Sequence, residues 1–290
     1  MKAIQTDKLT KFYGKSRGII DVDITVEIGD FYGFIGPNGA GKSTAIRTLL
    51  GLISPTRGAA QILGHDLSRD NIRILSQIGY LPSETIFYNG MKVSELLALS
   101  AKLRGVNCEQ ESNILCQRLE LDTSKKISEL SYGNRKKVGI VCALQHKPKL
   151  YILDEPTSSL DPLMQREFYS ILSERNNEGA TIFLSSHVLS EIGKYCKKAA
   201  VIRDGRILVE DTVEKLAHTG VKRVTIKGET QVIEDQFIKD VHKDDDTTSF
   251  LFSGESDRLI SYLSILKPLD FSVTDPDLEE VFMHYYKKEK

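Results

Sequence analysis

One stretch of the sequence combines the residue types that bind phosphate groups. It matches the pattern G-x-x-x-x-G-K-[ST] without a gap, and its members are Gly36, Pro37, Asn38, Gly39, Ala40, Gly41, Lys42, Ser43 and Thr44. Glycines let a backbone fold with its N–H groups aimed at phosphate oxygens, and a following helix adds its positive end. The lysine supplies a cation for the β- and γ-phosphates, and the Ser43 hydroxyl suits Mg²⁺. The pattern favours a nucleotide-binding loop over a plain glycine-rich turn.

A pair of acids supplies the second part of this chemistry. Asp154 and Glu155 directly follow the apolar run 150–153. A buried strand that ends in an acid places the carboxylate at the edge of the sheet, beside a phosphate loop, where Asp154 can hold the Mg²⁺ shell. Glu155 can polarise an attacking water. Either acid alone would be a weak signal, whereas the pair downstream of a phosphate loop is a strong one.

The secondary-structure elements that must position these groups are strands and helices, which follow one another along the first 220 residues. Short apolar or alternating runs at 19–26, 31–35, 150–153 and 181–184 predict strands, and helical spacing occurs at 43–50, 94–103 and 162–174. Strands that alternate with helices predict an α/β fold with a largely parallel sheet. Together with the phosphate loop, this pattern is typical of P-loop NTPases.

Charge divides the chain into two regions. The 290 residues carry a net charge of -1, but residues 221–290 hold 10 basic and 15 acidic residues, whereas residues 1–220 hold 29 and 25. We therefore expect two domains, with the second a small α+β domain. Its expected strands are 221–227 and 247–252, its expected helices are 256–266 and 277–287, and residues 243–246 form a charged turn.

Several function classes are disfavoured by the composition. No apolar run approaches the ~20 residues of a membrane helix, so we expect no spanning segment, and the N-terminus lacks the apolar core of a signal peptide. The near-neutral total gives no sign of nucleic-acid binding. The isolated cysteines lack metal-ligand spacing and are expected to be reduced packing residues; they are Cys108, Cys116, Cys142 and Cys196.

Further motifs resemble the ATP-binding subunits of ABC transporters. The segment 130–134, Leu-Ser-Tyr-Gly-Asn, is similar to the family signature, and the segment 154–162 looks like the metal-binding strand end and the D-loop. His187 stands where the family has its switch histidine, and Tyr13 matches the aromatic residue that stacks on adenine. The motifs occur in the family's order over roughly residues 1–210. The resemblance implies an ABC-type ATPase core over 1–220, with a helical subdomain at about 84–145, and makes 221–290 an accessory or regulatory domain.

The resemblance also implies a mechanism. Two such domains, in a homodimer or a close heterodimer, would pair head to tail around two ATP molecules. Ser131 and the Gly133 N–H would contact the γ-phosphate across the interface, Asp161 would belong to the nucleotide site, and His187 would contact the γ-phosphate. Simpler roles stay open: an ordinary helix N-cap for Ser131, a core or surface histidine for His187 and a strand aromatic for Tyr13.

The sequence departs from the family pattern at two places. The signature has Tyr132 in place of a glycine and Asn134 in place of glutamine. The family's Q-loop glutamine is missing, because Ser83 stands in its position with Glu84 next to it. Ser83 is too short to reach the metal and water as glutamine would, and either Ser83 or Glu84 would have to serve the metal. Both departures bear on catalytic efficiency more than on the fold.

Three segments look like the branch of drug and peptide-antibiotic exporters, which includes bacitracin-type and lantibiotic-type transporters; they are 79–82, 87–97 and 275–282. The resemblance extends to exporters of amphipathic peptides such as phenol-soluble modulins. It implies a separate membrane-spanning permease, with this chain at the cytoplasmic face of the membrane. We expect Phe87 and Tyr88 to line the groove that accepts a permease helix. The alternatives are a soluble ABC ATPase that acts on ribosomes or DNA, and an importer ATPase.

Overall fold

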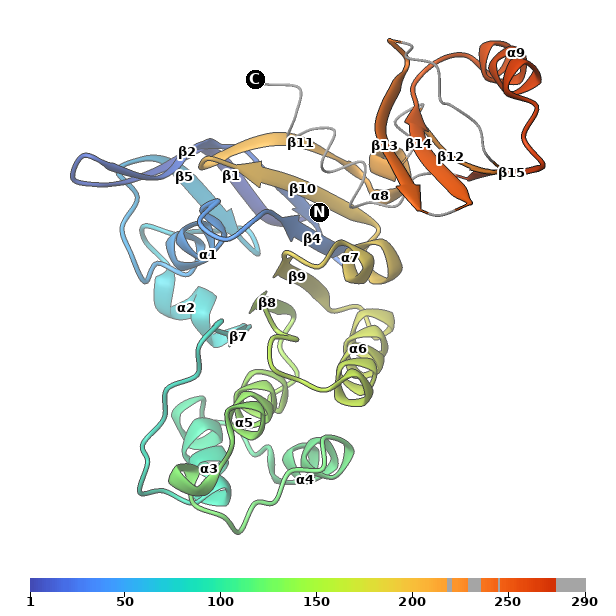
Figure 1. The fold of residues 1–290 in the computed structure, drawn as a ribbon. Helices are drawn as coiled ribbons and strands as arrows, with labels where there is room; N and C mark the ends of the chain where they lie inside the picture. The colour runs from blue at the N-terminus through green and yellow to red at the C-terminus, as the bar shows by residue number, and fades with distance from the viewer. Residues whose placement is uncertain (218–220, 229–235, 245, 275–290) are drawn as a thin grey trace. The chain divides into compact units, whose positions relative to one another are not determined.

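The computed structural model describes residues 1–217, 221–228, 236–244 and 246–274 (Figure 1). The chain forms two compact units, Met1–Asp211 and Thr212–Lys290. In the part of the chain that the structure describes, no helix is both long and apolar enough to cross a membrane.

A six-stranded sheet lies at the centre of the first unit, in the order β11-β10-β4-β9-β8-β7. Adjacent strands from β10 to β7 are parallel. The strands are β4 (Phe31–Ile35), β7 (Ile78–Leu81), β8 (Leu150–Asp154), β9 (Thr181–Ser186), β10 (Lys198–Arg203) and β11 (Arg206–Thr212). Strands β4, β8 and β9 are buried along their whole length, which explains why they read as continuous apolar runs. The predicted largely parallel sheet is confirmed.

Outside the segment between β7 and β8, four helices alternate with the strands along the first unit. They are α1 (Lys42–Leu49), α2 (Asn71–Ser76), α6 (Pro162–Asn177) and α7 (Leu189–Tyr195). The helices expected at 43–50 and 162–174 are confirmed with slightly different ends. Asp161 caps the N-terminus of helix α6, and Pro162 is its first residue. Proline is suited to this position because the first N–H groups of a helix have no partner within the helix.

A second, antiparallel sheet was not predicted. Its strands are β1 (Lys2–Tyr13), β2 (Ser16–Val22), β3 (Thr25–Glu27), β5 (Arg57–Ile62) and β6 (His65–Asp66). The prediction of a single strand at 19–26 is wrong, because the strand is interrupted between the end of β2 at Val22 and the start of β3 at Thr25. There the Thr6 hydroxyl donates to Val22 O and accepts from Ile24 N, both at 2.8 Å, so one side chain replaces the ladder bonds. Both strands pair with β1.

One continuous apolar core joins the two sheets with α1 and α2. It contains Ile4 of β1, Ile46 of α1 and Phe183 of β9, all fully buried. The ring of Phe183 stacks on Tyr32 at a centroid distance of 5.7 Å, which adds aromatic packing to the centre of the parallel sheet. This core fixes β4 and α1, and therefore the loop between them.

The stretch between β7 and β8 is helical (Figure 1). It contains α3 (Val93–Leu103), α4 (Glu109–Arg118), a short 3₁₀ turn (Ile127–Glu129) and α5 (Tyr132–Leu144). Glu95 in the first turn of α3 accepts from Lys92 N at 2.9 Å, which satisfies one of the free donors at the helix start. The helix expected at 94–103 is confirmed.

The second unit contains a four-stranded sheet in the order β13-β14-β12-β15, and its strand pairs are antiparallel. Its elements are α8 (Val213–Ala217), β12 (Lys222–Lys227), β13 (Ile238–Asp244), β14 (Thr247–Phe252), α9 (Ser256–Leu266) and β15 (Asp270–Thr274). Its small core includes Val224, Phe250 and Tyr262. The strands expected at 221–227 and 247–252 and the helix at 256–266 are confirmed. The helix expected at 277–287, part of the turn at 243–246 and the segment 275–282 lie outside the described residues.

Candidate functional site

The loop between β4 and α1 adopts the backbone that its glycines allow. Gly41 has φ of 109° and stands at the N-cap of α1, and a Cβ built on it would lie 2.9 Å from Gly18 O. Only glycine tolerates both this φ and this close approach. Helix α1 therefore begins with its free N–H groups at the loop, as a phosphate site requires.

A pocket of about 320 Å³ lies over this loop. It is lined by Arg17, Gly18, Pro37, Asn38, Gly39, Gly41, Lys42, Ser43, Thr44, Ser83 and Glu155. Two other residues of the motif are outside that lining: a Cβ on Gly36 would lie 2.5 Å from Ile202 O, and Ala40 O accepts from Gly205 N at 2.9 Å. Gly36 and Ala40 thus anchor the loop to the strand edge rather than face the pocket.

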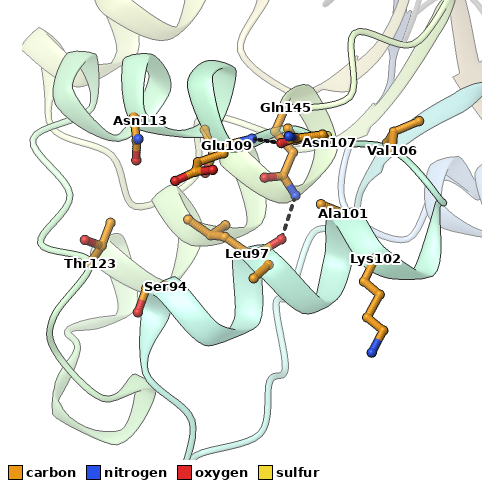
Figure 2. Close-up of a pocket in the computed structure, with 13 residues that line it drawn as sticks. Ser94, Leu97, Ala101, Lys102, Val106, Asn107, Glu109, Asn113, Thr123 and Gln145 are labelled. Carbon is orange, nitrogen blue, oxygen red and sulfur yellow. Dashed lines mark hydrogen bonds between the residues drawn. The ribbon is translucent and has the colours of Figure 1, made fainter.

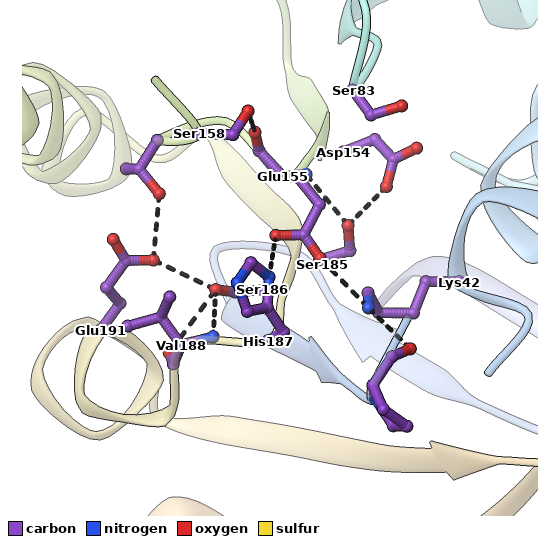
Figure 3. Close-up of polar contacts among 12 residues, drawn as sticks. Lys42, Ser83, Asp154, Glu155, Ser158, Ser185, Ser186, His187, Val188 and Glu191 are labelled. Atoms are coloured by element: carbon purple, nitrogen blue, oxygen red, sulfur yellow. Dashed lines mark hydrogen bonds and ion pairs between the residues drawn. The ribbon is translucent and has the colours of Figure 1, made fainter. Parts of the chain in front are cut away.

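Lys42 is buried, with 6% of its side chain exposed, and its ammonium group has three oxygen partners, of which Glu155 is labelled in Figure 3. It donates to the carbonyls of Gly36 and Pro37, and it lies 3.1 Å from Glu155 Oε1. A cation held by two carbonyls and one carboxylate at the base of a pocket can exchange partners when an anion enters.

Asp154 ends β8 and is almost completely buried. Its Oδ1 accepts from Ser185 Oγ at 2.6 Å, while Oδ2 is buried and bonds to none of the described residues. A carboxylate oxygen left unpaired in this way costs free energy unless a cation or a water satisfies it. Mg²⁺ prefers such oxygen ligands and is held by one or two carboxylates together with phosphates. Asp154 and the hydroxyl of Ser43 therefore fit the metal that the sequence predicts.

Glu155 is placed by an unusual backbone conformation and by contacts with Ser185 and His187. Its φ is 47°, in the left-handed region that a non-glycine residue rarely adopts. Its N–H donates to Ser185 Oγ at 3.1 Å, and its Oε2 lies 2.8 Å from His187 Nδ1. The prediction placed His187 on a γ-phosphate, and here it contacts the acid that would activate the water.

Glu191 in α7 forms hydrogen bonds with residues near both Glu155 and His187 (Figure 3). Its Oε2 accepts from Thr157 Oγ1 at 3.2 Å, from Ser186 Oγ at 3.1 Å and from Tyr169 OH at 2.9 Å. Thr157 follows Glu155 by two residues and Ser186 directly precedes His187. One carboxylate oxygen thus sets the spacing between the two strand ends that carry the catalytic candidates.

The two residues at the missing glutamine are placed differently. Ser83 lines the phosphate pocket, whereas Glu84 is exposed and is absent from that lining. Of the two, Ser83 is therefore the better candidate for a contact with metal or phosphate.

The signature segment lies at the start of α5. Ser131 is the N-cap, with its Oγ accepting from Asn134 N at 3.3 Å, so the simpler role is present in this chain. A Cβ on Gly133 would lie 2.8 Å from Ser159 O, which means that the signature and the D-loop touch and that glycine is required there. Asp161 caps α6 by accepting from Leu163 N and Met164 N. Contacts of these residues with nucleotide across a dimer stay predictions.

Tyr13 lies at the end of β1 and is half exposed. Its ring carbon Cε2 would be 3.1 Å from a Cβ on Gly18, a residue of the pocket lining, and Lys11 Nζ lies 5.5 Å from the ring centroid. An exposed ring beside the phosphate pocket has a free face for a base.

Arg17, Ser185 and Glu191 were missed by sequence reasoning. Arg17 lines the pocket and pairs with Asp204. Ser185 and Ser186 directly precede His187 at the end of a buried strand, and that position was the signal that could have identified Ser185. Glu191 had no such signal, because its role depends on three partners that are separated in sequence.

A second pocket, of about 470 Å³, lies among the helices between β7 and β8 (Figure 2). Its wall includes Leu97, Ala101, Val106, Asn107 and Gln145. The Gln145 side chain is buried and donates from Nε2 to Leu97 O at 3.2 Å, which ties α5 to α3. None of its lining residues belongs to the phosphate pocket.

The fold and this site define a P-loop ATPase cassette. Residues 19–158 match the family described as ABC transporter. The chain is 40% identical over 216 residues to the bacitracin transport ATP-binding protein BcrA of Bacillus licheniformis, covering 71% of this chain and 69% of that protein. It is 35% identical over 211 residues to the lantibiotic transport ATP-binding protein SrtF of Streptococcus pyogenes, covering 71% and 90%. The chain belongs to the ATP-binding subunits of ABC transporters, and it is an ATPase of that family.

Solved structures agree with this assignment. An ATP-binding subunit of an ABC transporter matches with a TM-score of 0.70 and 32% identity, over 74% of this chain and 91% of that one. A dimeric ATP-binding cassette with ADP and Pi bound matches with a TM-score of 0.66 and 22% identity, over 72% and 98%. The latter likeness supports the fold alone.

Proposed function

We propose that this chain is the ATP-hydrolysing subunit of an exporter, bound to a separate membrane-spanning permease at the cytoplasmic face of the membrane. The observation that carries the catalytic part is that Glu155, which lines the phosphate pocket together with Lys42, contacts both Lys42 and His187 and directly follows Asp154. These groups supply the positive charge, the metal ligand and the base that phosphoryl transfer to water needs.

The residues divide the work of hydrolysis. Lys42 and the backbone N–H groups of the loop bind the β- and γ-phosphates and stabilise their charge. Glu155 accepts a hydrogen bond from the attacking water and holds it in line, while His187, 2.8 Å from Glu155, fixes the carboxylate. Ser43 and Asp154 would hold Mg²⁺, which would supply positive charge to the phosphate oxygens.

We propose a head-to-tail dimer as the working unit, either of two copies or of this chain and a close relative. Ser131 is exposed at the start of α5, and its neighbour Gly133 touches the D-loop at Ser159. A second subunit that presents its phosphate loop to this helix start would find a hydroxyl and free N–H groups suited to an anion.

Export is favoured over the alternatives by the named functions of the relatives. BcrA and SrtF are named for transport of bacitracin and a lantibiotic. An importer ATPase is the second candidate, and it differs in the direction of ATP-driven movement. A soluble ABC ATPase acting on ribosomes or DNA would need no permease, and the sequence carries one phosphate loop rather than two. The transported molecule would be a drug, an antibiotic or an amphipathic peptide.

The proposed permease contact is the loop before α3. Tyr88 and Ile86 are 73% and 89% exposed, whereas Phe87 is half-buried. Exposed apolar side chains next to one another are typical of an interaction surface. Phe87 is therefore a poorer test position than we expected from the sequence, because its removal also costs packing.

The experiment is co-expression with a candidate permease, a polytopic membrane protein from a neighbouring gene if one is found there, followed by purification in detergent. We expect the unchanged chain to co-purify and the variant Ile86→Ser/Tyr88→Ala to be lost from the complex while it binds ATP normally. Ile72→Ser, at a residue that is 88% exposed on α2, is the matched control and should co-purify. Co-purification of the double variant at the unchanged level would remove this docking site.

For the second unit we propose an accessory role in regulation or in dimer stability. Its acidic excess contrasts with the basic excess of residues 1–220. A chain that ends at Asp211 would have a lower dimer affinity or a changed ATPase rate. If both quantities stay the same, the unit is a structural extension.

A further inference from the structure

Lys136 is a buried lysine that the mechanism above does not use. It lies in the second turn of α5, only 1% of it is exposed, and no carboxylate lies within 4.0 Å of its Nζ among the described residues. Its Nζ donates instead to two backbone carbonyls, Ser83 O at 3.0 Å and Pro82 O at 3.2 Å. A buried charge that is held only by carbonyls is expensive, and a methionine would fill similar space without that cost.

The electrostatic surroundings show where this charge acts. Burial lowers the pKa of Lys136 to about 8, while the nearby carboxylates of Asp154 and Glu155 act in the opposite direction and raise that pKa. The side chain is therefore mostly protonated at pH 7 and lies within the field of the two acids of the nucleotide site.

The two ends of this contact belong to different parts of the site. Helix α5 begins at the signature residue Ser131, and Pro82 and Ser83 directly follow β7. Ser83 lines the phosphate pocket. Because serine is short, its hydroxyl can serve that pocket only if the backbone that carries it is held close by. Two hydrogen bonds from a charged donor to this backbone provide such a restraint.

We propose that Lys136 is a positioning residue that ties the signature helix to the backbone of residues 82–83 and thereby holds Ser83 against the phosphate pocket. The inference rests on the proposed nucleotide site. This contact also connects α5 directly to the pocket, so a movement of the start of α5 would shift the position of Ser83.

The test uses Lys136→Met, which keeps the stem and removes the ammonium, in the full chain. We expect kcat for ATP to fall about tenfold while the ATP dissociation constant and KM change less than about threefold, because the lost group acts on the catalytic arrangement rather than on phosphate binding. Lys136→Arg keeps the charge and the donors, and it should restore kcat to within about threefold. Lys137→Met is the matched control, since it removes a charge from the next position of α5, where the ammonium makes no hydrogen bond or ion pair with the described residues, and it should keep kcat within about twofold.

A double-mutant cycle keeps the inference falsifiable if one variant is unstable. Ser83→Ala should lower kcat as Lys136→Met does, and the double variant should lose no more than either single one, because both changes disable one unit. Additive losses would overturn the inference, as would a normal kcat in Lys136→Met or a failed rescue by arginine. Absence of ATP binding in the unchanged chain would overturn the proposed site itself, which is a separate and recognisable result.

Discussion

The ammonium of Lys42 lies 3.1 Å from Oε1 of Glu155, so the cation of the phosphate loop is paired with the acid that would activate the water. Both side chains are largely buried, which strengthens the attraction relative to a pair in open water. A polyphosphate would give Lys42 stronger anionic partners, so we expect its binding to release Glu155 from the pair. The Glu155 carboxylate would then be free to bind water only when the phosphate site is occupied.

Removal of the Lys42 ammonium should remove most of the phosphate affinity. In Lys42→Ala we expect the dissociation constant for ATP to rise at least about tenfold, equivalent to about 1.4 kcal/mol. Isothermal titration measures this directly. Ser170→Ala, on the exposed side of α6, is a suitable control. An unchanged titration curve would contradict the assignment of the loop.

Glu191 should behave as a residue that acts through others. Loss of its carboxylate in Glu191→Ala removes one hydrogen bond each from Thr157, Ser186 and Tyr169 and loosens the spacing between Glu155 and His187. We expect kcat to fall about five- to twentyfold with little change in KM. Tyr169→Phe removes only one of the three bonds and should have a smaller effect. A larger loss of turnover in Tyr169→Phe than in Glu191→Ala would argue against this role.

Tyr13 should contribute to affinity and not to chemistry. Stacking of a base on an aromatic ring is independent of which purine is bound, so Tyr13→Ala should weaken ATP and GTP alike. We expect KM to rise several-fold at unchanged kcat, and Tyr13→Phe to behave as the unchanged chain. If maximal turnover falls while affinity is intact, the ring does not stack on the base.

His146 gives the first unit a specific acid sensitivity. Its Nε2 lies 3.2 Å from Ile78 O, and burial, assisted by the charge of Arg104, lowers the pKa of the ring to about 4. An unfolded chain protonates histidine near ~6.5, so it binds more protons than the folded chain between these values. The stability due to the neutral ring is therefore complete above about pH 6.5 and is lost as the pH falls toward 4.

The variant His146→Gln keeps a donor for Ile78 and does not titrate. Its melting temperature should fall less between pH 7 and pH 5 than that of the unchanged chain. Thermal denaturation at a series of pH values measures this difference, and parallel curves for the two proteins would contradict a lowered pKa of His146 in the folded chain.

The parallel sheet and the phosphate loop were predictable from local sequence, because buried strands are continuous apolar runs and the loop motif is contiguous. The antiparallel sheet was not predictable, since its long strand β1 mixes charged and apolar residues without strict alternation. The strand break after Val22 depends on the side chain of Thr6, 16 residues away in sequence.

The site shows the same limit. Lys42, Asp154, Glu155 and His187 occur in motifs, and the structure brings them together. Whether Glu155 pairs with Lys42, His187 or both depends on distances across three strands, which no local pattern encodes. Glu191 and Lys136 have no role in the phosphate-binding or acidic motifs, and only their contacts with distant segments reveal them.

The most direct measurement of the central claim is ATP turnover by Glu155→Gln. Glutamine keeps the size of the side chain and removes the charge that would activate the water. We expect ATP to bind as tightly as before, turnover to fall at least about a hundredfold, and ATP to convert the chain to a stable dimer in size-exclusion chromatography. Turnover at the unchanged rate would contradict the account, because the residue at the centre of the site would then have no part in hydrolysis.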